Sequence, residues 1–278
     1  MIYRYRYVTH SSFSPAIEWH FFKLRAIPCN NEFQHVGAHD LFITPACHLY
    51  HSKDGQGNAV QWGSFDTPHS SFEVVSEGVV VQTEPYLLHE KPAAYYLVQT
   101  KLTEYSEEML SFARERVKEL KSERVSAAEE AFPEDSDAFA VAIMLMHAVH
   151  AHLNYTPCHT STTTTAKDVF TDPRGVCQDY AHLMIALCRA LGLHARYVNG
   201  FIAGEGQTHA WVEVSDGQVW RAYDPTHDIA PSWGYVKIAH GRDADDCPTT
   251  RGRIYSWTQE TMTVSVSTQQ DPPPTPPK

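Results

Sequence analysis

A cysteine, a histidine and an aspartate in the second half of the chain have the types and spacing of a nucleophile, its base and an orienting acid. Cys177 lies in the stretch RGVCQDYAHLMIALCRALGL, residues 174–193, where a helical rhythm begins. A helix start offers unpaired N–H groups and the positive end of the macrodipole, which favour a thiolate and can hold an oxyanion. Gly175 allows a sharp turn and close substrate approach. Cys188 lies on the apolar stripe of the same helix and is expected in the core.

The histidine and the aspartate lie on two predicted strands of one hairpin. The segment HAWVEVSDGQVWRAYD contains Asp216–Gly217, a favoured pair for a two-residue type I′ turn. With that turn Ser215 opposes Gln218, and His209 lies directly opposite Asp224. Directly opposed side chains have Cβ atoms about 4.5–5.5 Å apart, within reach of a hydrogen bond from imidazole to carboxylate. A one-residue slip would separate the pair onto opposite faces.

Each of these residues alone has an ordinary structural explanation, but together they favour a Cys177–His209–Asp224 triad. In this hypothesis His209 takes the thiol proton or pairs with the thiolate, while Asp224 fixes the imidazole. Cys177 attacks an amide carbonyl and forms a thioester, and its backbone N–H with a second donor binds the oxyanion. Water or an amine then releases the acyl group. Tyr155 is a weak candidate for the second oxyanion donor, because it can also be explained as an aromatic residue at the end of the preceding helix.

The surrounding pattern predicts the elements that position these residues. Residues 1–90 contain alternating and β-branched runs, which predict a small all-β, sandwich-like domain. Residues 91–270 contain two further helices, over 104–131 and after Asp135–Ser136, and then the cysteine helix and the strands of the catalytic core. Residues 271–278, DPPPTPPK, are expected to form a disordered tail.

Composition limits the classes of function. The chain has 278 residues, 42% apolar and 20% charged, with a net charge of −11 that argues against a nucleic-acid partner. No apolar run is long enough for a membrane span, and the first residues lack a signal-peptide pattern, so a cytoplasmic location is expected. The six cysteines are scattered without a C-x-x-C pair, which predicts free thiols. Nothing in the sequence predicts the oligomeric state.

Other polar residues give weaker signals. His147 and His150 could share a metal at i and i+3, but His152 points elsewhere and no H-E-x-x-H occurs, so surface or satisfied histidines are preferred. Asp179, in the first turn of the cysteine helix, is expected to complement its dipole. His182 is expected to be structural. No metal and no cofactor are predicted.

The chain resembles bacterial transglutaminase-like proteins, a group that includes candidate cysteine proteases. The matching stretches are RGVCQDYAHLMIALCRALGLHARYVNGF, THAWVEV, YDPTH and YVKIAHGRDADDCPTTRG, and the β-rich start is similar as well. The resemblance covers the chain up to about residue 268 and places the family's Cys, His and Asp on Cys177, His209 and Asp224. It implies an α+β fold with a papain-like core, in which a nucleophile helix packs on an antiparallel sheet.

The resulting hypothesis is a thiol enzyme that acts on peptide or amide bonds of a peptide or protein substrate, most simply a cysteine peptidase or amidase. Two alternatives stay open at this point. Acyl transfer to an amine uses the same thioester with a different acceptor. A binding or scaffold protein would use the β domain and leave the triad idle.

Overall fold

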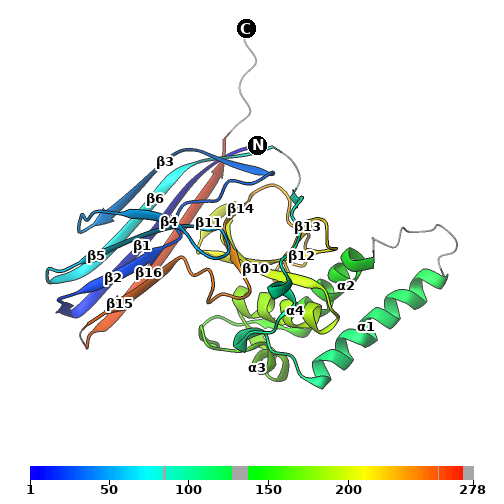
Figure 1. The fold of residues 1–278 in the computed structure, drawn as a ribbon. Helices are drawn as coiled ribbons and strands as arrows, with labels where there is room; N and C mark the ends of the chain where they lie inside the picture. The colour runs from blue at the N-terminus through cyan, green and yellow to red at the C-terminus, as the bar shows by residue number, and fades with distance from the viewer. Residues whose placement is uncertain (84–85, 127–136, 256, 272–278) are drawn as a thin grey trace, which may run out of the picture.

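The structure is a computed structural model that describes residues 1–83, 86–126, 137–255 and 257–271. A β sandwich forms one half of the molecule, and helices packed on a curved sheet form the other (Figure 1). This arrangement confirms the expected α+β class with a sandwich-like N-terminal region. Of the expected tail 271–278, residues 272–278 lie outside the described residues, as does the predicted N-cap at Asp135–Ser136. Asp271 is not part of a free tail, because its N–H donates to the Ile2 carbonyl and its carboxylate pairs with Arg4.

The sandwich consists of two antiparallel sheets. The five-stranded sheet has the order β11-β16-β1-β6-β3, and the four-stranded sheet has the order β15-β2-β5-β4. Alternating apolar residues of β1 face inward, as the sequence pattern predicts. The strands are β1 (Ile2–Ile17), β2 (His20–Leu24), β3 (Gln34–Thr44), β4 (Tyr50–Lys53), β5 (Ala59–Phe65), β6 (His69–Gln82), β11 (Gly204–Gly206), β15 (Thr250–Ile254) and β16 (Gln259–Gln270).

The last two strands of the chain belong to the sandwich, which differs from the expectation that residues 91–270 form the catalytic core. β16 pairs with β1 from Tyr3↔Gln270 to Ser14↔Gln259, and β15 pairs with β2. The alternating segment MTVSVSTQ predicts a strand. It does not predict which strand this one pairs with, because pairing over such a sequence distance is not a local property. The N-terminal sheets are therefore completed by the C-terminal end of the chain.

The core sheet carries the predicted histidine strand at its centre. Its order is β14-β10-β12-β13-β7, and all the pairings are antiparallel. Its strands are β7 (Leu87–Leu88), β10 (His194–Ile202), β12 (His209–Ser215), β13 (Trp220–Tyr223) and β14 (Tyr235–Gly241). A separate parallel pair joins β8 (Asn154–Tyr155) to β9 (Arg174–Gly175) just before the cysteine helix.

The cysteine helix is the central helix of the core. α4 (Cys177–Ala190) packs on β10 and β12, and every residue from Asp179 to Arg189 is buried, so the helix has no solvent face. Around it lie the 3-10 helices η1 (Ala94–Leu97) and η2 (Lys101–Thr103) and the helices α1 (Glu107–Ser126), α2 (Asp137–His152) and α3 (Ala166–Thr171).

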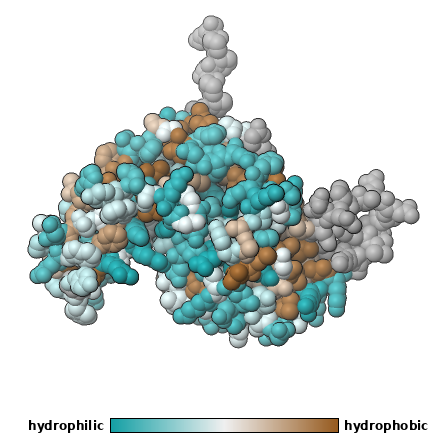
Figure 2. Space-filling view, in the orientation of Figure 1, coloured by the Kyte–Doolittle hydropathy of each residue, from teal (hydrophilic) through white to brown (hydrophobic). Residues whose placement is uncertain are grey.

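The surface in the view of Figure 2 is mostly hydrophilic, and its apolar side chains form separate patches. No helix among the described residues is long and apolar enough to cross a bilayer.

Candidate active site

The Asp179 carboxylate caps the start of α4, and Gly175 leaves the space that this side chain needs. Val176, in extended conformation, precedes the helix, and the Asp179 carboxylate accepts hydrogen bonds from the Val176 N–H at 2.8 Å and the Thr160 hydroxyl at 2.6 Å. A Cβ on Gly175 would lie 2.6 Å from the Asp179 Cβ. Gly175 is therefore required for space rather than for a positive φ. The cap leaves Cys177, half-buried, as the first residue of the helix.

The hairpin between β12 and β13 differs from the predicted two-residue turn. Ser215 pairs with Trp220, so the loop has four residues, and the Asp216 carboxylate accepts hydrogen bonds from the N–H groups of Gln218 and Val219. Type I′ needs positive φ at both central residues, and in this loop only Gly217 has it, with a φ of 103°. The predicted register is therefore wrong by two residues. A shift of two keeps every side chain on its face, and His209 still meets Asp224.

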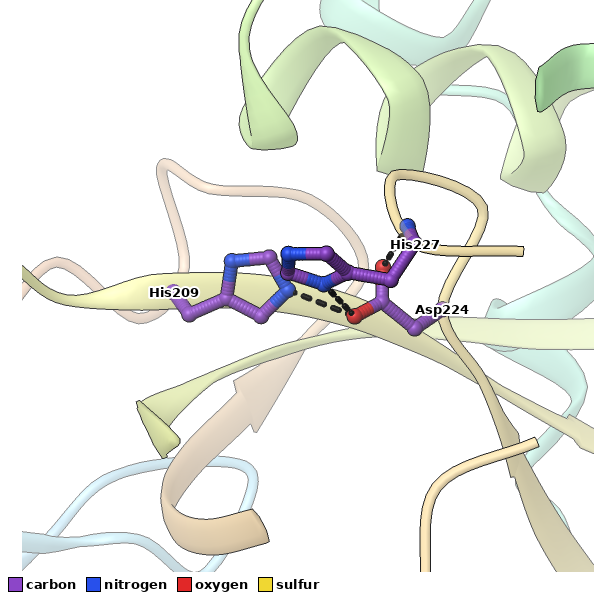
Figure 3. Close-up of side chains that lie close together, drawn as sticks. All are labelled: His209, Asp224 and His227. Atoms are coloured by element: carbon purple, nitrogen blue, oxygen red, sulfur yellow. Dashed lines mark hydrogen bonds and ion pairs between the residues drawn. The ribbon is translucent and has the colours of Figure 1, made fainter. Parts of the chain in front are cut away.

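Asp224 receives hydrogen bonds on both of its carboxylate oxygens. His209 Nε2 and His227 Nδ1 each lie 2.7 Å from Asp224 Oδ2, and the Tyr235 hydroxyl donates to the same oxygen at 2.7 Å. Figure 3 shows the two imidazole rings converging on this oxygen. The backbone N–H groups of Thr226 and His227 donate to Oδ1. The carboxylate is thus held in one orientation from two sides.

The electrostatics of this cluster favour a protonated His209 paired with an ionised Asp224. Burial alone would raise the pKa of Asp224, but the hydrogen bonds and charge of His209 outweigh it and hold that pKa well below its usual range. Burial alone would lower the pKa of His209, but hydrogen bonding to Asp224 and to Cys177 raises it to about 9. His209 therefore carries a proton at neutral pH and forms an ion pair with Asp224.

Cys177 and His209 both line a large cleft. The cleft has a volume of about 1120 Å³, and its lining includes Cys177, His209, His227, Tyr155 and Glu205. The side chain of Cys177 lies next to the His209 ring and is one of the groups that raise the pKa of His209. Asp224, in contrast, is fully buried behind His209. The structure thus brings the three predicted residues together in the order nucleophile, imidazole, carboxylate.

Two further partners of Asp224 were not predicted from the sequence. His227 follows Asp224 by three residues in the stretch YDPTH, and a search for polar pairs at that spacing would have found it. Tyr235 belongs to β14, and no local pattern connects it to Asp224. Trp211 shields the cluster on the sheet side, since its ring packs against Tyr235 at 5.3 Å. A Cβ on Gly200 would lie 2.5 Å from the Trp211 ring, so this glycine makes room for it.

The same three side chains have the spacing of metal ligands. Ligand atoms of His209, Asp224 and His227 lie within 4.8 Å of one another, the only such group of three among the described residues. In the structure these atoms bond to one another, so the cluster is fully accounted for by hydrogen bonds.

The weaker candidates occupy distinct places. The three histidines of α2 do not converge: His147 contacts Asp228, His150 contacts the Pro225 carbonyl, and His152 contacts the Phe170 carbonyl. His182 is buried and accepts a hydrogen bond from the Ala244 N–H, as expected for a structural residue.

Tyr155 and Cys188 are the other two residues that the sequence relates to the thiol of Cys177. Tyr155 lines the cleft, where burial and the charge of Cys177 raise its pKa; its role as an oxyanion donor stays a hypothesis. Cys188 is fully buried, and burial raises its pKa to about 12.

Two protein families match separate parts of the chain. Residues 125–225 match the transglutaminase-like superfamily, and residues 3–81 match the bacterial transglutaminase-like N-terminal region. The chain therefore contains a transglutaminase-like core domain preceded by a bacterial transglutaminase-like N-terminal domain. The matched core contains Cys177, His209 and Asp224.

Two sequence relatives and one solved structure match most of the chain. An uncharacterized protein of Mycobacterium leprae is 28% identical over 85% of this chain and 86% of its own. An uncharacterized protein of Mycobacterium tuberculosis is 28% identical over 95% of this chain and 88% of its own. The crystal structure of a candidate cysteine protease from Cytophaga hutchinsonii matches with a TM-score of 0.74 and 21% identity, over 98% of this chain and 92% of its own.

Proposed function

We propose that the protein is a thiol hydrolase that cleaves peptide or amide bonds through a thioester on Cys177. The observation that carries the proposal is the position of His209, which interacts with Cys177 on one side and with the buried Asp224 on the other. Because Nε2 of His209 donates to Asp224, Nδ1 is the ring nitrogen left to exchange a proton with the sulfur.

The proposed reaction uses only groups of this chain and water. The thiolate of Cys177 attacks the carbonyl carbon, and the backbone N–H at the start of α4 stabilises the oxyanion. Nδ1 of His209 then gives its proton to the leaving amine, which departs and leaves a thioester. In the second half His209 takes a proton from water, and the hydroxide attacks the thioester and releases the acid. Asp224 stabilises the imidazolium whenever it carries the proton.

Acyl transfer to an amine is the second candidate, supported by the match to the transglutaminase-like superfamily. The thioester is the same, and an amine replaces water in its breakdown. A peptide or protein substrate and a cytoplasmic location are part of the proposal, as is the absence of a nucleic-acid or membrane partner.

Alkylation of the cysteines tests the nucleophile. Cys158 is exposed and lies in the same cleft, whereas Cys177 is only half-exposed. Access alone would therefore make iodoacetamide label Cys158 faster. We expect Cys177 to react at least about tenfold faster near neutral pH, because the neighbouring imidazolium stabilises its thiolate. Mass spectrometry of tryptic peptides at timed intervals measures both rates.

The product of the reaction distinguishes the two activities. A peptide library incubated with the protein and a primary amine, then read by mass spectrometry, should show cleavage or deamidation without conjugation, and Cys177→Ala should show neither. Amine conjugates would identify the transferase instead. Faster labelling of Cys158 and no Cys177-dependent product would contradict both enzymatic candidates and leave the binding or scaffold alternative.

A further inference from the structure

The segment between β10 and β12 links the sandwich to the catalytic histidine. After β10 the chain leaves the core sheet, and β11 pairs with β16 through Gly204↔Thr268 and Gly206↔Val266 at the edge of the five-stranded sheet (Figure 1). After residues 207 and 208 it returns to the core sheet at His209. Residues 205–208 therefore line one wall of the cleft on a backbone that is paired at one end with the sandwich.

Another part of the cleft lining, at Tyr155, offers a free strand edge. In the parallel pair of β8 and β9, the N–H groups of Asn154 and Thr156 bond to the carbonyls of Pro173 and Gly175. Backbone groups alternate in direction along a strand, so the N–H and C=O of Tyr155 point away from β9. Tyr155 lines the cleft with Cys177. An exposed strand edge is the element to which an extended peptide adds as a further strand.

The charges that line the cleft do not cancel. Asp245 forms an ion pair with Arg251 at 2.9 Å, and His209 and His227 both contact the Asp224 carboxylate behind them. Glu205 has no ion-pair or hydrogen-bond partner among the described residues, and its side chain is exposed in the middle of β11. An unbalanced carboxylate remains in the cleft of a chain whose net charge is −11.

The Glu205 side chain is accessible from solvent. All three residues of β11 are exposed, and Glu205 lies among the residues that line the cleft. A side chain from a bound peptide can therefore reach the carboxylate.

We propose that the cleft takes an extended peptide whose backbone pairs with the free edge at Tyr155 and whose Lys or Arg side chain binds Glu205. This inference rests on the proposed function of Cys177, which lines the same cleft as Tyr155 and Glu205. The substrate class is then a peptide with a basic residue close to the bond that is attacked. The strand edge fixes the direction of the chain, and the carboxylate selects the side chain.

A matched peptide series tests the charge selection. Fluorescein-labelled octapeptides that carry Lys or Gln at each position in turn are assayed for cleavage by the wild type, Glu205→Gln and Glu205→Lys. We expect Lys at one position to raise kcat/KM about 2–5-fold over Gln, the range for an exposed charge pair, and the gain to shrink as salt is added. Glu205→Gln should bring the ratio to about one, and Glu205→Lys should invert it. Glu260→Gln, an exposed change on β16, serves as the control and should keep the wild-type ratio.

N-methylated peptides test the strand pairing. Methylation of a backbone nitrogen removes one donor, so cleavage should fall at alternate positions if the peptide lies as a strand. Uniform tolerance of methylation would contradict the strand, and a Lys preference that survives Glu205→Gln would contradict the charge contact.

A binding experiment separates failure of this inference from failure of the proposed function. Fluorescence polarisation of the same Lys and Gln peptides with Cys177→Ser measures recognition without chemistry. Glu205-dependent binding with no cleavage by the wild type would support the inference and overturn the enzyme. Cleavage that needs Cys177 but shows no dependence on Glu205 would do the reverse. Absence of both binding and cleavage would overturn the two together.

Discussion

Asp224 and Glu213 are two buried carboxylates on the same hairpin, and different kinds of partner stabilise their charges. Both side chains are fully buried. Glu213 is held by Arg196, by Lys237 at 2.8 Å to both of its oxygens, and by the Tyr86 hydroxyl. Burial alone would raise the pKa of Glu213, but the charges of Arg196 and Lys237 lower it to about 2.

The partners of the two carboxylates differ in what they can do. Arg196 and Lys237 are themselves buried, and no residue of the Glu213 cluster lines the cleft. Asp224 is held by imidazoles and a phenol, and His209 extends from it to the cleft wall. A buried ionic cluster of permanent charges positions a sheet, whereas one that contains a titratable group next to an opening can move a proton.

The largest expected effect distinguishes these two clusters by substitution. Asp224→Asn should lower the Cys177-dependent rate by about 10³-fold or more, because the amide no longer stabilises the imidazolium. Glu213→Gln should instead lower the free energy of unfolding by about 3–5 kcal/mol, because Arg196 and Lys237 lose their buried countercharge. Peptide cleavage and guanidinium unfolding of both variants measure the two effects.

The opposite pattern of effects would contradict this distinction between the Asp224 and Glu213 clusters. A Glu213→Gln protein of wild-type stability that has lost activity would place that cluster in the chemistry. An Asp224→Asn protein that labels and cleaves like the wild type would remove Asp224 from it.

The next effect is a pH dependence of stability that comes from His209. Its pKa is raised from 6.5 in the unfolded chain to about 9 in the folded protein. The stabilising contribution is therefore complete below pH 6.5 and is lost as the pH rises through 9. We expect the difference in unfolding free energy between wild type and His209→Gln to shrink by at most about 3 kcal/mol between these limits.

Urea unfolding at several pH values measures this change. His10→Gln provides a control, because His10 forms an exposed pair with Glu73 at 3.5 Å and should contribute little at any pH. A constant difference between wild type and His209→Gln would contradict the raised pKa of His209.

The smallest effect concerns His227, the half-exposed second histidine on Asp224. In His227→Ala the carboxylate keeps the side chains of His209 and Tyr235 and the backbone donors to Oδ1. Loss of one hydrogen bond of about 1 kcal/mol should change the Cys177 alkylation rate about fivefold or less. A loss as large as that of Asp224→Asn would show that His227 takes part in proton transfer.

Local sequence patterns predicted the residues of the site better than their geometry. The helix start at Cys177 and the His209–Asp224 hydrogen bond follow from periodicity and strand alternation, and both are present. The turn was wrong because the carboxylate of Asp216 captures two N–H groups and opens the loop to four residues. The catalytic roles themselves stay predictions.

Features that depend on distant parts of the chain could not be found in this way. Tyr235 reaches Asp224 from another strand, and the pairing of β16 with β1 joins the two ends of the described chain. The local sequence of a strand shows only alternation and apolar runs. These patterns are the same whichever other strand it pairs with. The sandwich was therefore predicted as a class but without its last strands.

The place of β16 has a consequence for how the protein is made. This strand lies between β11 and β1, so residues 259–270 are needed before the sheet can join the segment that leads to His209. On the ribosome β1 can pair with β6 early, but its other edge must wait for residues 259–270, and contacts so distant in sequence form late. Because Val266 of β16 lines the cleft, a nascent chain has no finished cleft until synthesis has passed residue 270.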